Sequence, residues 1–353
     1  MIFFVLILLM VLISSMKISA TGEFNKEYLS RENTGMIKGI FVFLVLLGHA
    51  VTYIKVDGIA DELYIDLKNH LNQMVVAMFF FYSGYGMMKS IMKKRFDYIK
   101  GIPLKRFLIV FINFSAAVML FVLVNLMLGK TFPLTTILLS MIGWSSVGNS
   151  NWYMFAIFAV YILLFLSFYM LRWYDKPIML YFCTVLFSVL TMIFVYWEIR
   201  MGLPTWWYNT VILVPFGCWY AIFQKTIDSV IMKNGFTYFG ILSFLVLAYV
   251  ISFIHRWDGG IEYYTVWALI FTSIVVCLSM KVTFDNQIIK WFGQHIFSIY
   301  ILQRIPMLFF SRIGLAAKEK YMYIVLCIVF TILFAMIFDY FMDKLDRKIV
   351  RYL

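Results

Sequence analysis

Charged residues are scarce in this sequence, and their scarcity excludes a soluble fold. They make up 14% of the 353 residues, whereas apolar residues make up 63%, and the mean hydropathy is +0.89. Soluble domains average about 25% charged and about 45–50% apolar residues. A soluble core of this length could not bury so much apolar surface. The composition therefore predicts an integral membrane protein.

Acidic residues are the scarcest charged type. The formal net charge is +12, because the chain has 30 Lys and Arg but only 18 Asp and Glu. In a soluble protein such a surplus suggests nucleic-acid binding. In a membrane protein it first indicates which loops face the cytoplasm. We therefore expect the lipid bilayer as a partner, and no nucleic acid.

Cysteines are few, and their spacing is not that of a metal site. Four of them lie far apart in apolar runs, with no CxxC pair and no paired His: Cys183, Cys218, Cys277 and Cys327. Such spacing predicts packed or lipid-facing thiols. We expect no disulfide, no metal ion and no permanently bound cofactor.

Apolar windows long enough to cross a bilayer recur along the chain. A transmembrane helix needs roughly 20 mostly apolar residues. Eleven windows qualify, near residues 1–18, 38–56, 71–90, 105–128, 152–171, 178–197, 207–224, 236–254, 264–281, 295–311 and 321–342. The stretch 134–144 is too short to span and predicts an interfacial or re-entrant piece. The expected fold is an all-α polytopic bundle of about 11 transmembrane helices.

Basic residues gather in alternate loops. If residues 17–38 are cytoplasmic and each span crosses once, the cytoplasmic segments hold 21 of the 30 basic residues. The loop 89–106 alone holds seven, against the single acid Asp97. The opposite orientation would violate the positive-inside tendency. We expect a multi-pass protein of the cell membrane, with its N-terminus outside and its C-terminus in the cytoplasm.

One predicted helix carries both a cation and an imidazole, at Lys38 and His49. Eleven helical steps return to within about 20° of the same face and rise about 16 Å. Ionisable residues at membrane depth are usually functional, and imidazole suits proton transfer near neutral pH. The stripe fits a long anionic ligand that enters from the cytoplasm. The alternative is that Lys38 only marks the membrane boundary and that His49 bonds a neighbouring helix.

Four segments form an ordered set of short motifs. They are Lys38-Gly-Ile-Phe-Val-Phe-Leu-Val-Leu-Leu-Gly-His49, Phe79-Phe-Phe-Tyr-Ser-Gly-Tyr85, Asn151-Trp-Tyr-Met154 and Trp291-Phe-Gly-Gln-His-Ile-Phe-Ser-Ile-Tyr-Ile-Leu-Gln303. In order and spacing they resemble the acyltransferase-3 family of membrane acyltransferases. The resemblance covers residues 36 to about 342. It implies a ten-helix core, residues 36–353, ending in a short basic cytoplasmic tail. Residues 1–35 would add an extra N-terminal transmembrane helix and a cytoplasmic linker.

The resemblance implies an enzyme, an O-acetyltransferase that moves an acyl group, usually acetyl, from cytoplasmic acyl-CoA to a hydroxyl of a cell-envelope carbohydrate. His49 and Lys38 would then be the catalytic residues, with Lys38 neutralising CoA phosphates or a charged partner of the site. The basic loop would bind the phosphates of CoA through five side chains: Lys93, Lys94, Arg95, Lys105 and Arg106. Expected partners are acyl-CoA as co-substrate, the carbohydrate acceptor, and other envelope-glycan assembly proteins.

Six further residues are candidates for lining the site: Ser83, Tyr85, Trp152, Tyr300, Gln303 and Arg304. Two residues depart from the family pattern, since Lys38 replaces a more usual Arg and Gln303 replaces a common His. Ser83 could form a covalent acyl-enzyme, although Ser83-Gly84 also fits a packing point between helices.

Other polar residues have expected structural or alternative roles. Asp57 and Asp61 would bind sugar hydroxyls or form a solvated loop face. Asp339 would pair with a cytoplasmic Lys or Arg. A different functional class also remains, a multi-span transporter, flippase or polymerase for lipid-linked sugars. Related halves or matching broken helices would favour a transporter.

Overall fold

The computed structural model describes residues 1–174, 176–255 and 260–352, and nearly all of its regular structure is helical. Its longer helices are α1 (Ile2–Ser15), α2 (Arg31–Ala50), α3 (Ile59–Leu71), α4 (Met74–Lys94), α6 (Ile109–Met127), α8 (Trp152–Phe168), α9 (Pro177–Arg200), α10 (Leu213–Ile231), α11 (Gly235–Ile254), α12 (Ile261–Ser279) and α17 (Lys320–Tyr352). Its shorter helices are η1 (Val51–Tyr53), α5 (Phe96–Ile99), η2 (Pro103–Leu108), α7 (Leu134–Met141), η3 (Tyr169–Arg172), η4 (Thr205–Trp207), α13 (Gln287–Gln294), α14 (Ile296–Leu302), α15 (Arg304–Arg312) and α16 (Leu315–Lys318).

Eight helical segments in the described part of the chain are long and apolar enough to cross a membrane. They are Arg31–Tyr53, Ile59–Lys94, Phe96–Met127, Trp152–Arg172, Pro177–Arg200, Gly235–Ile254, Ile261–Ser279 and Lys320–Arg351. Many of their side chains are apolar and exposed, as expected for surfaces that face lipid rather than water. The predicted all-helical membrane architecture is therefore confirmed.

The expected count of about eleven spans is not confirmed, because three predicted windows differ from single long apolar helices. Helix α1 has 14 residues and rises about 21 Å, whereas the hydrocarbon core is about 30 Å thick. Helix α10 carries Gln224, Lys225 and Asp228 in its second half. The window 295–311 is divided at Gln303 into α14 and α15.

Two short strands tie the N-terminal segment to a distant part of the chain. Strand β1 (Met16–Ile18) pairs antiparallel with β2 (Val282–Phe284), with Lys17 opposite Thr283. Lys17 also forms an ion pair of 2.6 Å with Asp285. The strand ends the first helix at Ser15, which is why α1 is shorter than the predicted window 1–18.

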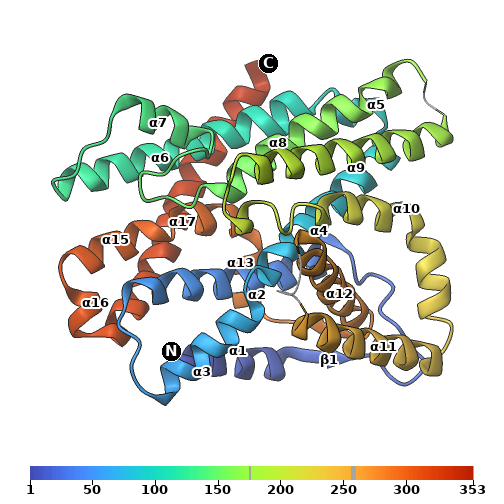
Figure 1. Cartoon of the computed structure of the whole chain (residues 1–353), viewed down its shortest axis with the longest axis horizontal. Helices are drawn as coiled ribbons and strands as arrows, with labels where there is room; N and C mark the ends of the chain where they lie inside the picture. The colour runs from blue at the N-terminus through green and yellow to red at the C-terminus, as the bar shows by residue number, and fades with distance from the viewer. Residues whose placement is uncertain (175, 256–259, 353) are drawn as a thin grey trace.

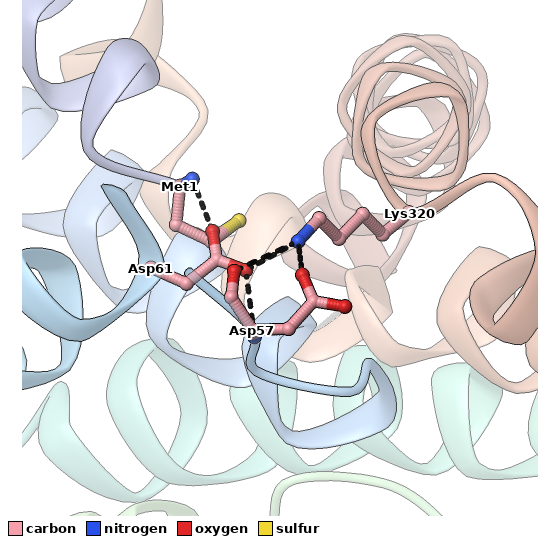
Figure 2. A network of polar contacts seen from close by, with 4 residues as sticks. All are labelled: Met1, Asp57, Asp61 and Lys320. Carbon is pink, nitrogen blue, oxygen red and sulfur yellow. Dashed lines mark hydrogen bonds and ion pairs between the residues drawn. The ribbon is translucent and has the colours of Figure 1, made fainter. Parts of the chain in front are cut away.

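A polar network connects α1, α3 and the start of α17 (Figure 2). The Met1 amino group donates to Asp61 Oδ1 at 2.7 Å, and both side chains are fully buried. Lys320 donates to Asp61 Oδ2 at 2.7 Å and also pairs with Asp57. In Figure 1 the N-terminus lies beside α3, and α17 carries the C-terminus to the opposite side of the view.

Helix α2 lies at the centre of the packing that forms the candidate site. It contacts α4, α13, α14, α15 and α17. Its closest approach is to α13, where a Cβ atom on Gly293 would lie only 2.2 Å from the Gly35 carbonyl oxygen. Gly293 therefore permits the two backbones to touch next to Lys38.

Candidate active site

Three cavities follow α2 along its length. The histidine cavity, about 260 Å³, is lined by His49, Tyr64, Lys68, Asn69, Asn72, Gln73, Trp152 and apolar residues. The central cavity, about 470 Å³, is lined by Arg31, Lys38, Ser83, Arg106, Tyr153, Tyr161, Gln294, Tyr300 and apolar residues. The basic cavity, about 450 Å³, is lined by Arg31, Glu32, Gly35, Met36, Lys38, Lys290, Gly293 and Gln294.

Neighbouring cavities share wall residues. Arg31 and Lys38 line both the basic and the central cavity. Val45 of α2 and Val76 of α4 line both the central and the histidine cavity. Lys38 and His49 therefore line successive cavities along one helix, and two valine side chains stand between the central cavity and the histidine cavity.

The central and basic cavities are strongly positive. Arg31, Lys38 and Arg106 line the central cavity, and no carboxylate lines it within the described residues. The only acid on the basic cavity wall, within the same part of the chain, is Glu32, which pairs with Lys290 at 2.6 Å. The hydrogen bond that Lys290 donates to Glu32 raises the pKa of Lys290, so this lysine stays charged. Such a surface can hold a polyanion.

His49 lies half-buried near the end of α2. Its Nδ1 atom is buried and has no hydrogen-bond partner among the residues that the structure describes. Gln303, Arg304 and Lys68 lie near the ring. The His49 side chain lines the histidine cavity, which places its imidazole where a substrate hydroxyl could meet it.

The division between α14 and α15 places Gln303 next to His49. The Gln303 side chain is fully buried, and its Nε2 donates to the Tyr300 carbonyl at 3.0 Å. Pro306 follows three residues later and has no N–H to donate to the preceding turn, which accounts for the interruption of the helix. Pro306 was the local signal that could have predicted it.

The predicted donor-binding residues do not all meet at the cavities. Arg106 lines the central cavity and lies against the Tyr98 ring, with 5.9 Å between the guanidinium carbon and the ring centroid. Four others line none of the three cavities: Lys93, Lys94, Arg95 and Lys105. Arg31 takes part instead, and it had not been singled out from the sequence.

Of the other predicted site residues, some line a cavity and others do not. Ser83 and Tyr300 line the central cavity, and Trp152 lines the histidine cavity. Tyr85 lines none of the three and donates to Gln224 Oε1 at 2.8 Å. Arg304 lines none of them, but it lies near His49.

Asp339 pairs with no Lys or Arg of the described chain, contrary to expectation. It accepts hydrogen bonds from His295 and, at 2.9 Å, from the Ser298 hydroxyl. The His295 ring also stacks on Trp291, with 4.4 Å between the ring centroids. This cluster holds the junction of α13 and α14, directly after the cavity-lining residue Gln294.

In the segment 57–66, some acidic residues form contacts within the protein and others lie at the surface. Asp61 is fully buried and binds Met1 and Lys320, and Asp57 binds Lys320. Neither lines any of the three cavities. Both are therefore engaged in holding α1, α3 and α17 together.

A comparison with protein families matches residues 35–340 to a model described as an acyltransferase domain. Comparisons with curated proteins and with solved structures found no match. The matched region contains α2 with Lys38 and His49, and most of the helices long enough to span a membrane. The chain therefore belongs to the acyltransferase-3 family and is a membrane acyltransferase.

Proposed function

We propose that this protein transfers an acetyl group from cytoplasmic acetyl-CoA to a hydroxyl of a cell-envelope carbohydrate, with His49 as the catalytic base. The observation that carries the proposal is the line of cavities along α2, from Arg31 and Lys38 to His49. A cationic entrance followed by a cavity that an imidazole lines suits a donor with a charged head and a reactive end.

The donor enters through the basic and central cavities. Arg31, Lys38 and Arg106 would bind the phosphates of CoA, because charge-assisted hydrogen bonds to phosphate are strong. The pantetheine arm would run along α2 past Val45 and Val76, both of which line the cavities on either side. The thioester would then lie beside His49.

The acceptor occupies the histidine cavity. His49 removes the proton from the acceptor hydroxyl as its oxygen attacks the thioester carbonyl carbon. The tetrahedral intermediate collapses, the carbon–sulfur bond breaks, and the departing thiolate takes the proton from His49. The products are the acetyl ester and free CoA thiol, and the imidazole returns to its neutral form.

The proposed reaction implies which side of the membrane each cavity faces. The basic cavity would face the cytoplasm, where acyl-CoA is made, and the histidine cavity would receive a carbohydrate from outside. The N-terminus would be external and the C-terminus cytoplasmic, in agreement with the charge distribution of the loops.

The test uses the purified protein in proteoliposomes with labelled acetyl-CoA and envelope glycans. We expect His49→Ala to lower kcat by about 10²–10⁴-fold, while CoA binding persists. His70→Ala is the matched control, because His70 lines none of the three cavities and contacts Tyr249 at 3.0 Å. Full activity of His49→Ala would refute the proposed role of this histidine.

A second measurement identifies the acceptor carbohydrate. Deleting the gene and comparing ester-linked acetyl groups on surface glycans by mass spectrometry should show a loss at one sugar hydroxyl. If the glycans are unchanged and the protein binds neither CoA nor acetyl-CoA, the acetyltransferase proposal is wrong, and transport of a lipid-linked sugar becomes the better hypothesis.

A further inference from the structure

Among the described residues, one charged side chain lines the histidine cavity, and it is basic. Lys68, in the last turn of α3, lines the cavity beside His49. No carboxylate lines the cavity within the part of the chain that the structure describes. A Cβ atom on Gly48 would lie 4.0 Å from the Lys68 Cε atom, which places this side chain against the α2 surface next to His49.

Among the described residues, Lys68 has no partner that neutralises its charge. Its ammonium forms no ion pair and no side-chain hydrogen bond with any described residue. Asp57 and Asp61, which precede Lys68 in the chain, are bound to Lys320. Arg304 adds a second positive charge near His49. A half-buried cation without a counter-charge is a binding element for an anion.

The rest of the cavity wall suits a single sugar unit. Gln73 is 8% exposed, and its Oε1 atom is buried without a hydrogen-bond partner in the described structure. The same side chain is fixed by a hydrogen bond of 2.7 Å from its Nε2 to the Trp206 carbonyl. A fixed, unpaired amide oxygen can accept a bond from a sugar hydroxyl. Trp152 supplies an aromatic surface on the same cavity.

The size of the cavity agrees with this assignment. Its volume of about 260 Å³ lies below the range of about 300–1,000 Å³ that is typical of drug-sized ligands. The turn between α3 and α4 sets this wall, with Asn72 at a φ of +39° between Lys68 and Gln73. One ring and its substituents would fill the space.

We propose that the sugar unit acetylated at His49 is anionic, and that Lys68 binds its carboxylate or phosphate. This inference rests on the proposed acetyl transfer and adds the chemical class of the acceptor. Lys68 would hold the anionic substituent, Gln73 would accept a bond from a ring hydroxyl, and a second hydroxyl would face His49.

The experiment compares three acceptors that lack a free 6-hydroxyl: methyl glucuronoside, methyl glucoside 6-phosphate and methyl 6-deoxyglucoside. For the native chain we expect kcat/KM to be about 10- to 100-fold higher for the preferred anionic acceptor than for the neutral one. Comparing the carboxylate with the phosphate shows which anion is bound.

Variants at residue 68 identify the group responsible. Lys68→Met should abolish the preference, chiefly through a higher KM for the anionic acceptor, whereas Lys68→Arg should retain most of it. Lys55→Met is the matched control, because Lys55 is exposed and lines none of the three cavities. Its preference should equal that of the native chain.

The two proposals fail in different ways. Equal kcat/KM for all three acceptors, or a preference that survives in Lys68→Met, would overturn the anionic acceptor and leave acetyl transfer standing. Acetyl transfer to none of the carbohydrates would overturn the proposed function itself.

Discussion

A Cβ atom on Gly84 of α4 would lie 1.9 Å from the Val214 carbonyl oxygen of α10. Side-chain carbons do not approach a carbonyl so closely, so these helices meet as they do because residue 84 has no side chain. The Cys218 thiol of α10 donates to the Gly84 carbonyl at 3.3 Å. Because Ser83 lines the central cavity, this contact also fixes part of the cavity wall.

Gly84→Ala should destabilise the protein by about 1–3 kcal/mol, because overpacking forces the two helices apart. The measurement is the thermal unfolding midpoint of the purified protein in detergent. Gly86→Ala is the matched control, since a Cβ at this position of the same helix would meet no described atom within 4 Å beyond the adjoining helix backbone. That variant should be neutral or slightly stabilised. Equal midpoints for the two variants would contradict the close contact.

Arg106→Gln should raise the KM for acetyl-CoA by about 10- to 100-fold, because it removes a charged donor from the central cavity. Lys94→Gln should change it far less, since Lys94 is exposed and lines none of the three cavities. Steady-state kinetics with both variants tests this difference. Similar effects would show that the phosphates bind the loop surface rather than the cavity.

Ser83→Ala should retain acetyl transfer within about tenfold, which corresponds to the loss of one ordinary hydrogen bond. Ser83 lies beside Tyr153, and we assign it to the cavity wall rather than to a covalent intermediate. The matched control is Ser90→Ala, whose exposed hydroxyl bonds the Gly86 carbonyl on the same helix. A labelled acetyl group trapped on the native chain and absent from Ser83→Ala would reverse the assignment.

Asp339→Asn should lower the free energy of unfolding by about 1–3 kcal/mol, because Asp339 accepts bonds from both His295 and Ser298. It should also raise the KM for acetyl-CoA, since Gln294 of the adjoining turn lines two cavities. Asp343→Asn, on the exposed face one turn later, should stay within about 0.5 kcal/mol of the native chain. If both variants unfold at the same temperature, the cluster does not stabilise the junction of α13 and α14.

The helical membrane architecture was predictable because it depends on local composition. Runs of about 20 apolar residues define spans wherever they occur. Lys38 and His49 share a helix, so helical periodicity alone predicts that they lie on one face. The structure places both on cavities along that helix.

The hydropathy pattern predicted less well the segments whose structure differs from one long apolar helix. The window 295–311 is apolar enough to read as one helix, but Pro306 follows a break at Gln303. The window 1–18 ends early because β1 pairs with β2, more than 260 residues later in the chain. Hydropathy does not encode such pairing.

The sequence by itself determined that this protein lies in a lipid bilayer and which helix carries His49, because both follow from residues that are neighbours in the chain. The tertiary structure decided which cations reach the cavities. In the sequence, Arg31 and Lys68 resemble ordinary residues at helix ends. Lys94 belongs to the most basic predicted loop, yet in the structure it ends α4 and lines none of the three cavities. A cavity wall is made by helices distant in sequence, so its charge depends on how they pack.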